Sequence, residues 1–187
     1  MKPALKPLRE DGVTLIEMMV AIAVMGVLLA LAAPSFTETI RKNRIESAAQ
    51  GFLNALNFAR TEAIRRGVAV TVRKSGSQWE NGYLAFVDAN KNDVQDTGEE
   101  TLRSWQALPS GYTLRTNSND FANLVRYNAR GEVDNYSVGG YFIVCHDSQT
   151  KGAKAVVITR MRPVMAADKD NNGVPESDSD NDIGICG

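Results

Sequence analysis

Hydrophobic and polar positions change their spacing twice along this chain. From residue 13 to residue 33 almost every position is apolar, and Glu17 is the single charged residue. A helix rises 1.5 Å per residue, so this segment would extend about 32 Å and cross the hydrocarbon core of a bilayer. Basic residues near the start of the chain favour a cytoplasmic N-terminus and an outward-facing body. The pattern therefore predicts a membrane-spanning helix over residues 13–34.

Beyond this segment, apolar residues recur at intervals of three and four, which is the period of one helix face. That face consists of Ile45, Ala49, Phe52, Leu56, Ala59 and Ala63. Pro34 and Gly51 are positions where such a helix bends, and Gly67 is a typical residue for its end. We expect an amphipathic helix over residues 35–66 that continues the apolar one.

After the helix, the apolar period falls to about two, which is the period of a β-strand. Runs rich in β-branched and aromatic residues predict strands at residues 68–72, 83–87, 101–107, 112–115, 124–127, 141–145 and 155–159. Turn-forming residues separate them at residues 81–82, 109–111, 129–131 and 151–152. A helix followed by antiparallel strands predicts an α+β fold with a β-rich head at residues 67–165.

Charge and composition narrow the function further. The 187 residues carry 21 basic and 22 acidic side chains, and a net charge of −1 does not indicate a nucleic-acid binder. Residues 166–187 hold six of the acidic side chains and Lys169 alone among the basic ones, so we predict an acidic C-terminal tail. One histidine and two cysteines leave little material for a zinc site or a catalytic triad. We therefore expect a protein that is not an enzyme.

The apolar segment begins with the letters GVTLIE at residues 12–17. This motif resembles the prepilin signal of type IV pilins and type II secretion pseudopilins. The resemblance implies that residues 1–12 are a leader peptide, which a prepilin peptidase removes between Gly12 and Val13, and that Val13 is then N-methylated. It also implies a bacterial inner-membrane protein with a single pass and a periplasmic C-terminal domain, which later enters a pilus or pseudopilus.

The same resemblance gives Glu17 an assembly role and makes Pro34 the helix-kinking proline of the family. Electrostatics supports the role of Glu17. In a filament core its carboxylate would lie in a low dielectric, where an unpaired charge costs several kcal/mol. The natural partner is the positive amino terminus of Val13 in a neighbouring subunit.

Motifs in the head narrow the resemblance to the GspH/FimT branch of the family. They lie at residues 59–67 (ARTEAIRRG), 86–92 (FVDANKN), 98–99, 130–131, 141–145 and 155–159. The implied fold is a lollipop, in which the second half of a long N-terminal helix packs on two small antiparallel sheets. The implied function is that of a minor pilin in type IV pilus assembly or initiation, with other pilins as partners. A GspH-type pseudopilin of type II secretion and a FimT-like, DNA-binding minor pilin are the alternatives.

Cys145 and Cys186 are the only cysteines, in a chain whose body is expected to face an oxidising compartment. A disulfide between them would tie the acidic tail to a strand and contribute roughly 3–4 kcal/mol through loop closure. A metal or nucleophile role together with His146 is the competing interpretation, but neighbours on a strand point to opposite faces. We expect the disulfide.

Two acidic stretches have the spacing of calcium-binding loops. The first has EF-hand spacing and offers oxygens from Asp88, Asn90, Asn92, the carbonyl of Val94, Asp96 and Glu99. Asp93 replaces the usual glycine there, and a polar hairpin is the competing interpretation. The second stretch contains the glycine and offers Asp168, Asp170, Asn172 and Glu176, against the interpretation of a solvated tail. Calcium is the only cofactor that the sequence suggests, with the first loop as the stronger candidate.

Arg160 and Arg162 follow the last predicted strand, where FimT-like proteins carry a basic G-R-x-R motif; here Thr159 replaces the glycine. Two arginines neutralise few phosphates, and nonspecific affinity for DNA grows with that number. Pairing of both arginines with the acidic tail is the competing interpretation and the one that we expect.

Overall fold

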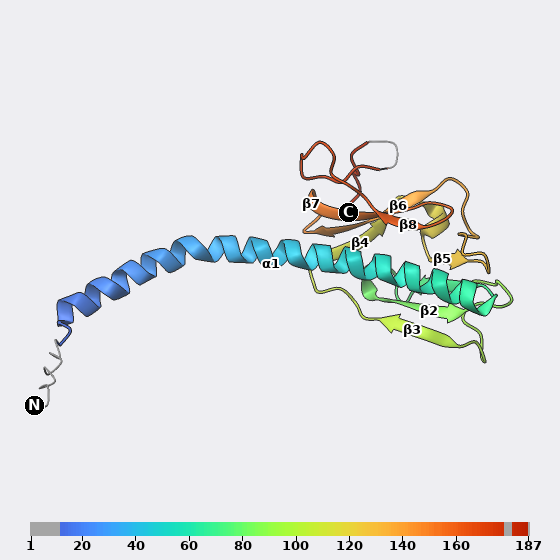
Figure 1. Cartoon of the computed structure of the whole chain (residues 1–187), viewed down its shortest axis with the longest axis horizontal. Coiled ribbons are helices and arrows are strands. Elements are labelled where there is room, and N and C mark those ends of the chain that lie inside the picture. Colours follow the sequence, from blue (N-terminus) through green and yellow to red (C-terminus); the bar gives the residue numbers. More distant parts are fainter. Residues whose placement is uncertain (1–11, 178–180, 187) are drawn as a thin grey trace, which may run out of the picture. The chain divides into compact units, whose positions relative to one another are not determined.

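The computed structural model describes residues 12–177 and 181–186, and of residues 30–34 the backbone alone. The chain divides into two compact units, Met1–Ile40 and Arg41–Gly187. One long helix, α1 (Leu15–Arg66), contributes to both units (Figure 1). The predicted apolar and amphipathic segments are therefore one continuous helix, which runs through Pro34 and Gly51.

In the second unit, α1 buries the face that the sequence predicts. Its members are each at most 1% exposed: Ile45, Ala49, Phe52, Leu56, Ala59 and Ala63. The helix ends at the expected glycine, because Gly67 has a φ of 69° and its N–H donates to the carbonyl of Ala63 at 2.9 Å. Glycine adopts this left-handed conformation without Cβ strain, so the end of α1 is encoded locally.

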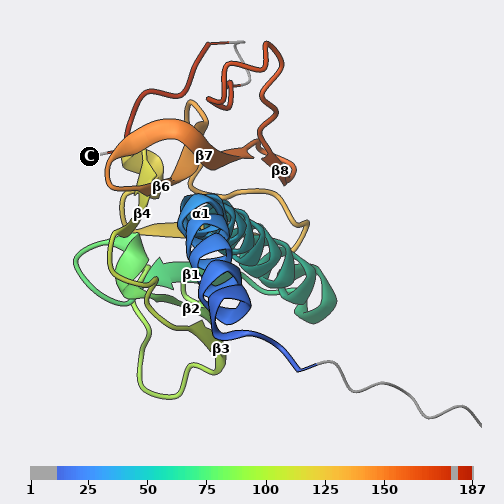
Figure 2. The same cartoon turned by 90° about the vertical axis from the view of Figure 1, so that its left-hand side faces the viewer.

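The described residues contain two four-stranded sheets, in which neighbouring strands are antiparallel. The first has the order β3-β2-β1-β5, and the second has the order β4-β6-β7-β8. The strands are β1 (Val70–Lys74), β2 (Tyr83–Val87), β3 (Thr101–Trp105), β4 (Tyr112–Thr116), β5 (Leu124–Tyr127), β6 (Gly140–His146), β7 (Gln149–Ile158) and β8 (Pro163–Met165). In Figure 2, strands of the two sheets form separate groups.

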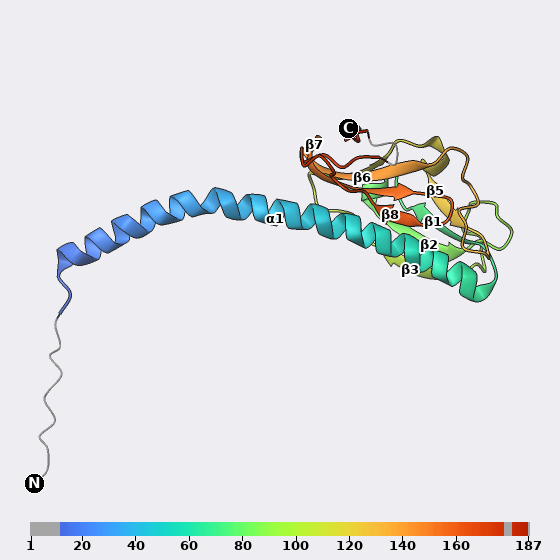
Figure 3. The ribbon, with the colours of Figure 1, turned by 45° about the horizontal axis from the view of Figure 1, so that its top comes forward.

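Side chains from α1 and from both sheets share one core in the second unit. Phe52 of α1 is fully buried, and its ring centroid lies 5.2 Å from that of Tyr83 in β2 and 4.6 Å from that of Phe142 in β6. Burying a large apolar side chain contributes about 1.5–3 kcal/mol. From Arg41 onward, α1 accordingly lies along strands of both sheets (Figure 3). These contacts confirm the predicted α+β fold of a helix packed on small antiparallel sheets.

The strand boundaries depart from the prediction mainly around β7. The turn before it lies at Asp147 and Ser148, with φ values of 49° and 57°, and not at residues 151–152. Two left-handed residues in a row match the twist of a tight hairpin, and Asp tolerates that conformation. Gly152 lies inside β7, with a φ of 81°. The short edge strand β8 was not predicted, because it has three residues and begins with Pro163.

Candidate functional site

The predicted processing site lies at the start of α1. Gly12 and Val13 precede the helix and are exposed. The hydroxyl of Thr14 accepts a hydrogen bond from the backbone N–H of Glu17 at 3.3 Å and so caps the helix. Glu17 is exposed in the first turn of α1, and leader residues 1–11 lie outside the described residues. The positions predicted for cleavage, methylation and assembly therefore lie just before and within the first turn of one helix.

The large apolar side chains of the first unit are exposed. Those from Val13 to Leu29 are 53–81% exposed. Pro34 lies within the continuous helix, and its side chain is outside the described ones. Within the described residues, no helix combines the length and the hydropathy needed to cross a bilayer. An exposed apolar surface of this extent marks a place where a nonpolar partner binds.

The acidic tail is tied to the second sheet. Cys145 and Cys186 form the predicted disulfide, with their Cα atoms 5.8 Å apart. Together with Ile143 and Ile183 they belong to a small second core, separate from the one under α1. His146 instead packs on a tyrosine ring of β4, with centroids 4.6 Å apart. The competing cysteine–histidine site is therefore not formed.

The first candidate calcium stretch folds into a loop whose oxygens accept hydrogen bonds from the protein. Asp88 is fully buried and accepts bonds from the hydroxyl of Thr71 at 2.8 Å and from the backbone N–H of Asn92 at 3.1 Å. Asp96 accepts bonds from the side-chain amides of Asn90 and Asn92 at 2.8 Å and 2.7 Å. The predicted ligands are thus close to one another, but they already have partners.

Two arginines of the first sheet hold this loop. Asp93 has a φ of 68°, at the position where an EF-hand loop uses glycine. Its carboxylate pairs with Arg126 of β5, and its carbonyl accepts a bond from Arg73 of β1. Glu99 accepts a bond from the backbone N–H of Ala89 at 3.2 Å. The left-handed turn is therefore present without glycine, and a protein cation already faces Asp93.

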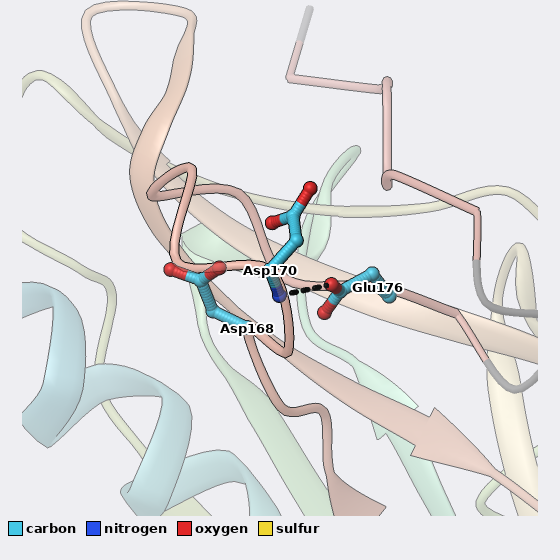
Figure 4. A group of neighbouring side chains, drawn as sticks. All are labelled: Asp168, Asp170 and Glu176. Carbon is cyan, nitrogen blue, oxygen red and sulfur yellow. Dashed lines mark hydrogen bonds between the residues drawn. The ribbon is translucent and has the colours of Figure 1, made fainter.

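The second candidate stretch gathers three carboxylates. Asp168, Asp170 and Glu176 offer oxygens that all lie within 4.8 Å of one another (Figure 4). Glu176 is 6% exposed and accepts bonds from the backbone N–H groups of Lys169 at 2.8 Å and Asp170 at 3.2 Å. Oδ2 of Asp168 accepts a bond from Gly173 at 3.0 Å, whereas Oδ1 is buried without a partner. Within the described residues, the first loop has no such group, so the geometry favours the second stretch and reverses the order that the sequence indicated.

Both stretches share a backbone conformation. In each, the two residues that flank an asparagine are left-handed, with φ values of 59°, 68°, 60° and 90° at Lys91, Asp93, Asn171 and Gly173. In the second stretch, the side chain of Asn172 also donates to Asp182 at 3.0 Å. Sequence reasoning did not single out Asp182, because its only signal was the acidic composition of the tail.

Arg160 and Arg162 lie in the hairpin between β7 and β8. The hydroxyl of Thr159 donates to the carbonyl of Arg162 at 2.7 Å and closes the turn. The guanidinium of Arg160 lies 5.0 Å from the ring centroid of Tyr136. Neither arginine forms an ion pair within the part of the chain that the structure describes, so the expected pairing with the acidic tail is not formed there.

Comparison with known families gives this geometry a context. Residues 48–161 match the family described as Type II transport protein GspH, and residues 8–33 match the prokaryotic N-terminal methylation motif. Since the first match covers more than half of the chain, the chain belongs to the GspH family. It is a member of the minor pilins and pseudopilins of type IV pili or type II secretion.

Individual relatives agree with this class. The chain is 37% identical over 89 residues to the pilin-like protein PilA1 of Thermus thermophilus, a match that covers 48% of this chain and 55% of PilA1. It therefore spans little more than half the length of that relative. Two crystal structures of the type IV minor pilin FimU from Pseudomonas aeruginosa share the fold. The TM-scores are 0.56 and 0.53 at 22% and 20% identity, over 71% and 65% of this chain and 92% of each FimU chain.

Proposed function

We propose that this chain is a minor pilin that takes part in the assembly or initiation of a type IV pilus. Its role is structural and not enzymatic. The observation that carries the proposal is the start of α1, where residues 12–17 lead into a helix with an exposed apolar surface. The description of FimU as a type IV minor pilin supports the choice of a pilus within the family.

In this proposal, a prepilin peptidase cleaves between Gly12 and Val13, and Val13 is N-methylated. The apolar helix at residues 13–34 holds the mature protein in the inner membrane, with the head at residues 67–165 in the periplasm. On assembly, the exposed apolar side chains of α1 leave the lipid and pack against the helices of other pilins. Glu17 pairs with the terminal amine of a neighbour, because a buried charge needs a partner.

The first test is the mass of the mature chain. Cleavage and methylation predict a protein that begins with N-methylated Val13, in cells that contain a prepilin peptidase. A Gly12→Val variant serves as the control and should keep the leader, because the motif has lost its glycine. A wild-type chain that keeps the leader peptide would contradict the proposal.

A GspH-type pseudopilin is the alternative that the family name favours. Complementation separates the two roles. The chain should restore surface pili to a strain that lacks its own minor pilin of this branch. It should not restore exoprotein release to a strain that lacks its secretion pseudopilin. The opposite result would assign the chain to type II secretion.

DNA binding is a second alternative, and exposure of Arg160 and Arg162 in the β7–β8 hairpin favours it. If these arginines contact phosphates, Arg160→Ala/Arg162→Ala should weaken DNA binding at low salt and reduce the salt slope by about two. A matched Arg65→Ala variant, from an exposed pair on α1, should bind DNA like wild type. No measurable binding by the wild-type chain would remove this alternative.

We also propose that the stretch from Asp168 to Glu176 binds Ca²⁺. Three observations support the fit: the three carboxylates lie together, Oδ1 of Asp168 is buried without a hydrogen-bond donor, and oxygen ligands are those that Ca²⁺ prefers. The ion would be held by Asp168, Asp170 and Glu176, and it would neutralise part of the acidic tail. Its role would be to order that tail.

Thermal unfolding in millimolar Ca²⁺ and in chelator tests the calcium proposal. At ten times its dissociation constant, an ion that binds only the folded state stabilises it by about 1.4 kcal/mol. Asp168→Asn/Asp170→Asn should abolish this shift, and Asp88→Asn/Glu99→Gln is the matched control. If the control variant alone loses the shift, the ion binds the first loop; if wild type shows none, neither stretch binds Ca²⁺.

A further inference from the structure

Thr14 and Glu17 have the spacing of a capping box, a motif in which two side chains cap the start of a helix reciprocally. The structure contains one half of that box. The hydroxyl of Thr14 accepts the N–H of Glu17 at 3.3 Å, and the carbonyl of Thr14 accepts the N–H of Met18 at 3.2 Å. Within the described residues, the carboxylate of Glu17 makes no return bond to the N–H of Thr14. Thr14 therefore caps α1 alone, and the carboxylate of Glu17 stays exposed.

Capping by Thr14, with the carboxylate of Glu17 left unbonded within the described residues, matters where apolar groups surround the start of the helix. The first N–H groups of a helix have no partner inside it, and an unsatisfied group in an apolar medium is costly. If the hydroxyl of Thr14 were absent, the carboxylate of Glu17 would be an acceptor within the same turn, since a glutamate at this position of a capping box bonds back to the helix start. A carboxylate that turns back to its own helix is no longer available to a neighbouring amine.

We propose that Thr14 is a positioning residue for assembly. Its hydroxyl accepts a backbone N–H at the start of α1 and thereby keeps the carboxylate of Glu17 free for a neighbouring subunit. This inference rests on the proposed assembly role of Glu17. Thr14 does not itself contact the partner subunit. Its effect on assembly is therefore expected only while Glu17 carries its charge.

A double-mutant cycle on the full-length chain tests this in cells that build the filament. The variants are Thr14→Val, which keeps the shape and removes the hydroxyl, Thr14→Ser, which restores it, Glu17→Gln, and Thr14→Val/Glu17→Gln. The measured quantity is the ratio of mature chain in sheared filaments to mature chain in the membrane fraction, with cleavage checked by intact mass.

Thr14→Val should lower the ratio roughly five-fold, in the range of a lost N-cap, and Thr14→Ser should stay within about two-fold of wild type. In the Glu17→Gln background, Thr14→Val should have no further effect. An equal further loss in that background would show that Thr14 acts independently of Glu17 and would overturn the inference. So would a wild-type ratio for Thr14→Val, or a precursor mass, since the hydroxyl would then serve cleavage.

Different results would reject the proposed assembly role of Glu17. A wild-type chain absent from filaments, or a Glu17→Gln ratio equal to wild type, would reject the assembly role of Glu17 without reference to Thr14. Either result would also overturn the inference that depends on it.

Discussion

Gly131 shows how one residue fixes the contact between α1 and the loop after β5. Its φ is 76°, and a Cβ added there would lie 2.5 Å from Cδ1 of Ile64 in α1. The Nε–H of Arg60 donates to the carbonyl of Gly131 at 2.9 Å, which holds the loop against the helix. The backbone conformation at this position favours glycine, and an added Cβ would also have to displace the end of Ile64, a residue that is 47% exposed.

Gly131→Ala should therefore lower the free energy of unfolding by roughly 2–3 kcal/mol, from left-handed strain together with the displacement of Ile64. Gly67→Ala is the matched control, since its φ is 69° and an added Cβ meets nothing within 4 Å. The control should lose about 1–2 kcal/mol, from strain alone. Urea unfolding curves, monitored through the fluorescence of the buried Trp79, measure the loss of stability in both variants. Equal losses would mean that Ile64 moves aside freely and would contradict the packing argument.

Among the described residues, Glu62 should make the clearest contribution to the pH dependence of folding stability. Hydrogen bonds from Arg65 and Arg66 lower the pKa of Glu62 from its usual 4.5 to about 2, and Arg66 also pairs with Glu100 at 2.6 Å. A depressed pKa in the folded state stabilises the fold above the unfolded pKa. That contribution is lost as the pH falls from about 4.5 toward 2.

Glu62→Gln should therefore be less stable than wild type at pH 7, by a few tenths to about 1 kcal/mol, because Arg65 and Glu100 of this ion-pair network are largely exposed although Glu62 is half-buried. The two proteins should approach equal stability only as the pH falls below about 2. Thermal unfolding across this range measures the difference. A difference that does not shrink on acidification would show that Glu62 acts through packing and not through its charge.

At the scale of elements, the sequence predicts those whose cause is local. The buried face of α1, its end at Gly67 and the position of β5 agree with the prediction, because period and glycine act within a few residues. The hairpin turn before β7 was misplaced, because Gly152 is a stronger turn signal than Asp147 and Ser148. Strand β8 depends on pairing with β7, which the spacing of its three residues does not reveal.

The candidate sites also combine features with a local cause and features that depend on distant residues. A resemblance to the prepilin signal pointed to residues 12–17, and spacing within the chain pointed to both acidic stretches as candidate sites. Spacing could not rank the stretches, because the rank depends on residues elsewhere in the chain. Arg73 and Arg126, from two strands of the first sheet, hold Asp93 in the first loop. In the second stretch, oxygens of Asp168, Asp170 and Glu176 lie within 4.8 Å of one another.

The tail is an element held by one covalent bond and a small core. Cys145→Ala/Cys186→Ala should cost about 3–4 kcal/mol of unfolding free energy, the expectation for a bridge across a separation of 41 residues. Ile183→Ala, which keeps the bridge and removes a buried side chain of the same small core, isolates the packing contribution at about 2–5 kcal/mol. Urea midpoints measure both, and native alkylation of wild type should find no free thiol. An unchanged midpoint for the double variant would show that the bridge does not stabilise the fold.

At the scale of the whole molecule, the two compact units have different surfaces. The first presents large apolar side chains along α1, whereas the second buries its apolar face of α1 in its own core. One helix therefore differs along its length: the second unit packs one of its faces in a core, whereas the first unit leaves large apolar side chains exposed. A change at the start of α1 should alter assembly without altering the stability of the head.

Glu17→Gln and Glu46→Gln test this separation, because they remove one carboxylate from each unit of the same helix. Glu17→Gln should lower the filament fraction more than ten-fold, since loss of one member of a buried pair leaves the other charge unpaired. It should leave the urea midpoint of the head and the disulfide unchanged. Glu46, whose side chain is 51% exposed and lies 3.4 Å from Lys154, should behave in the opposite way. Its replacement should cost at most about 1 kcal/mol in the head and leave filament entry at the wild-type level. If Glu46→Gln also prevented filament entry, or if Glu17→Gln destabilised the head, the two units would not act separately.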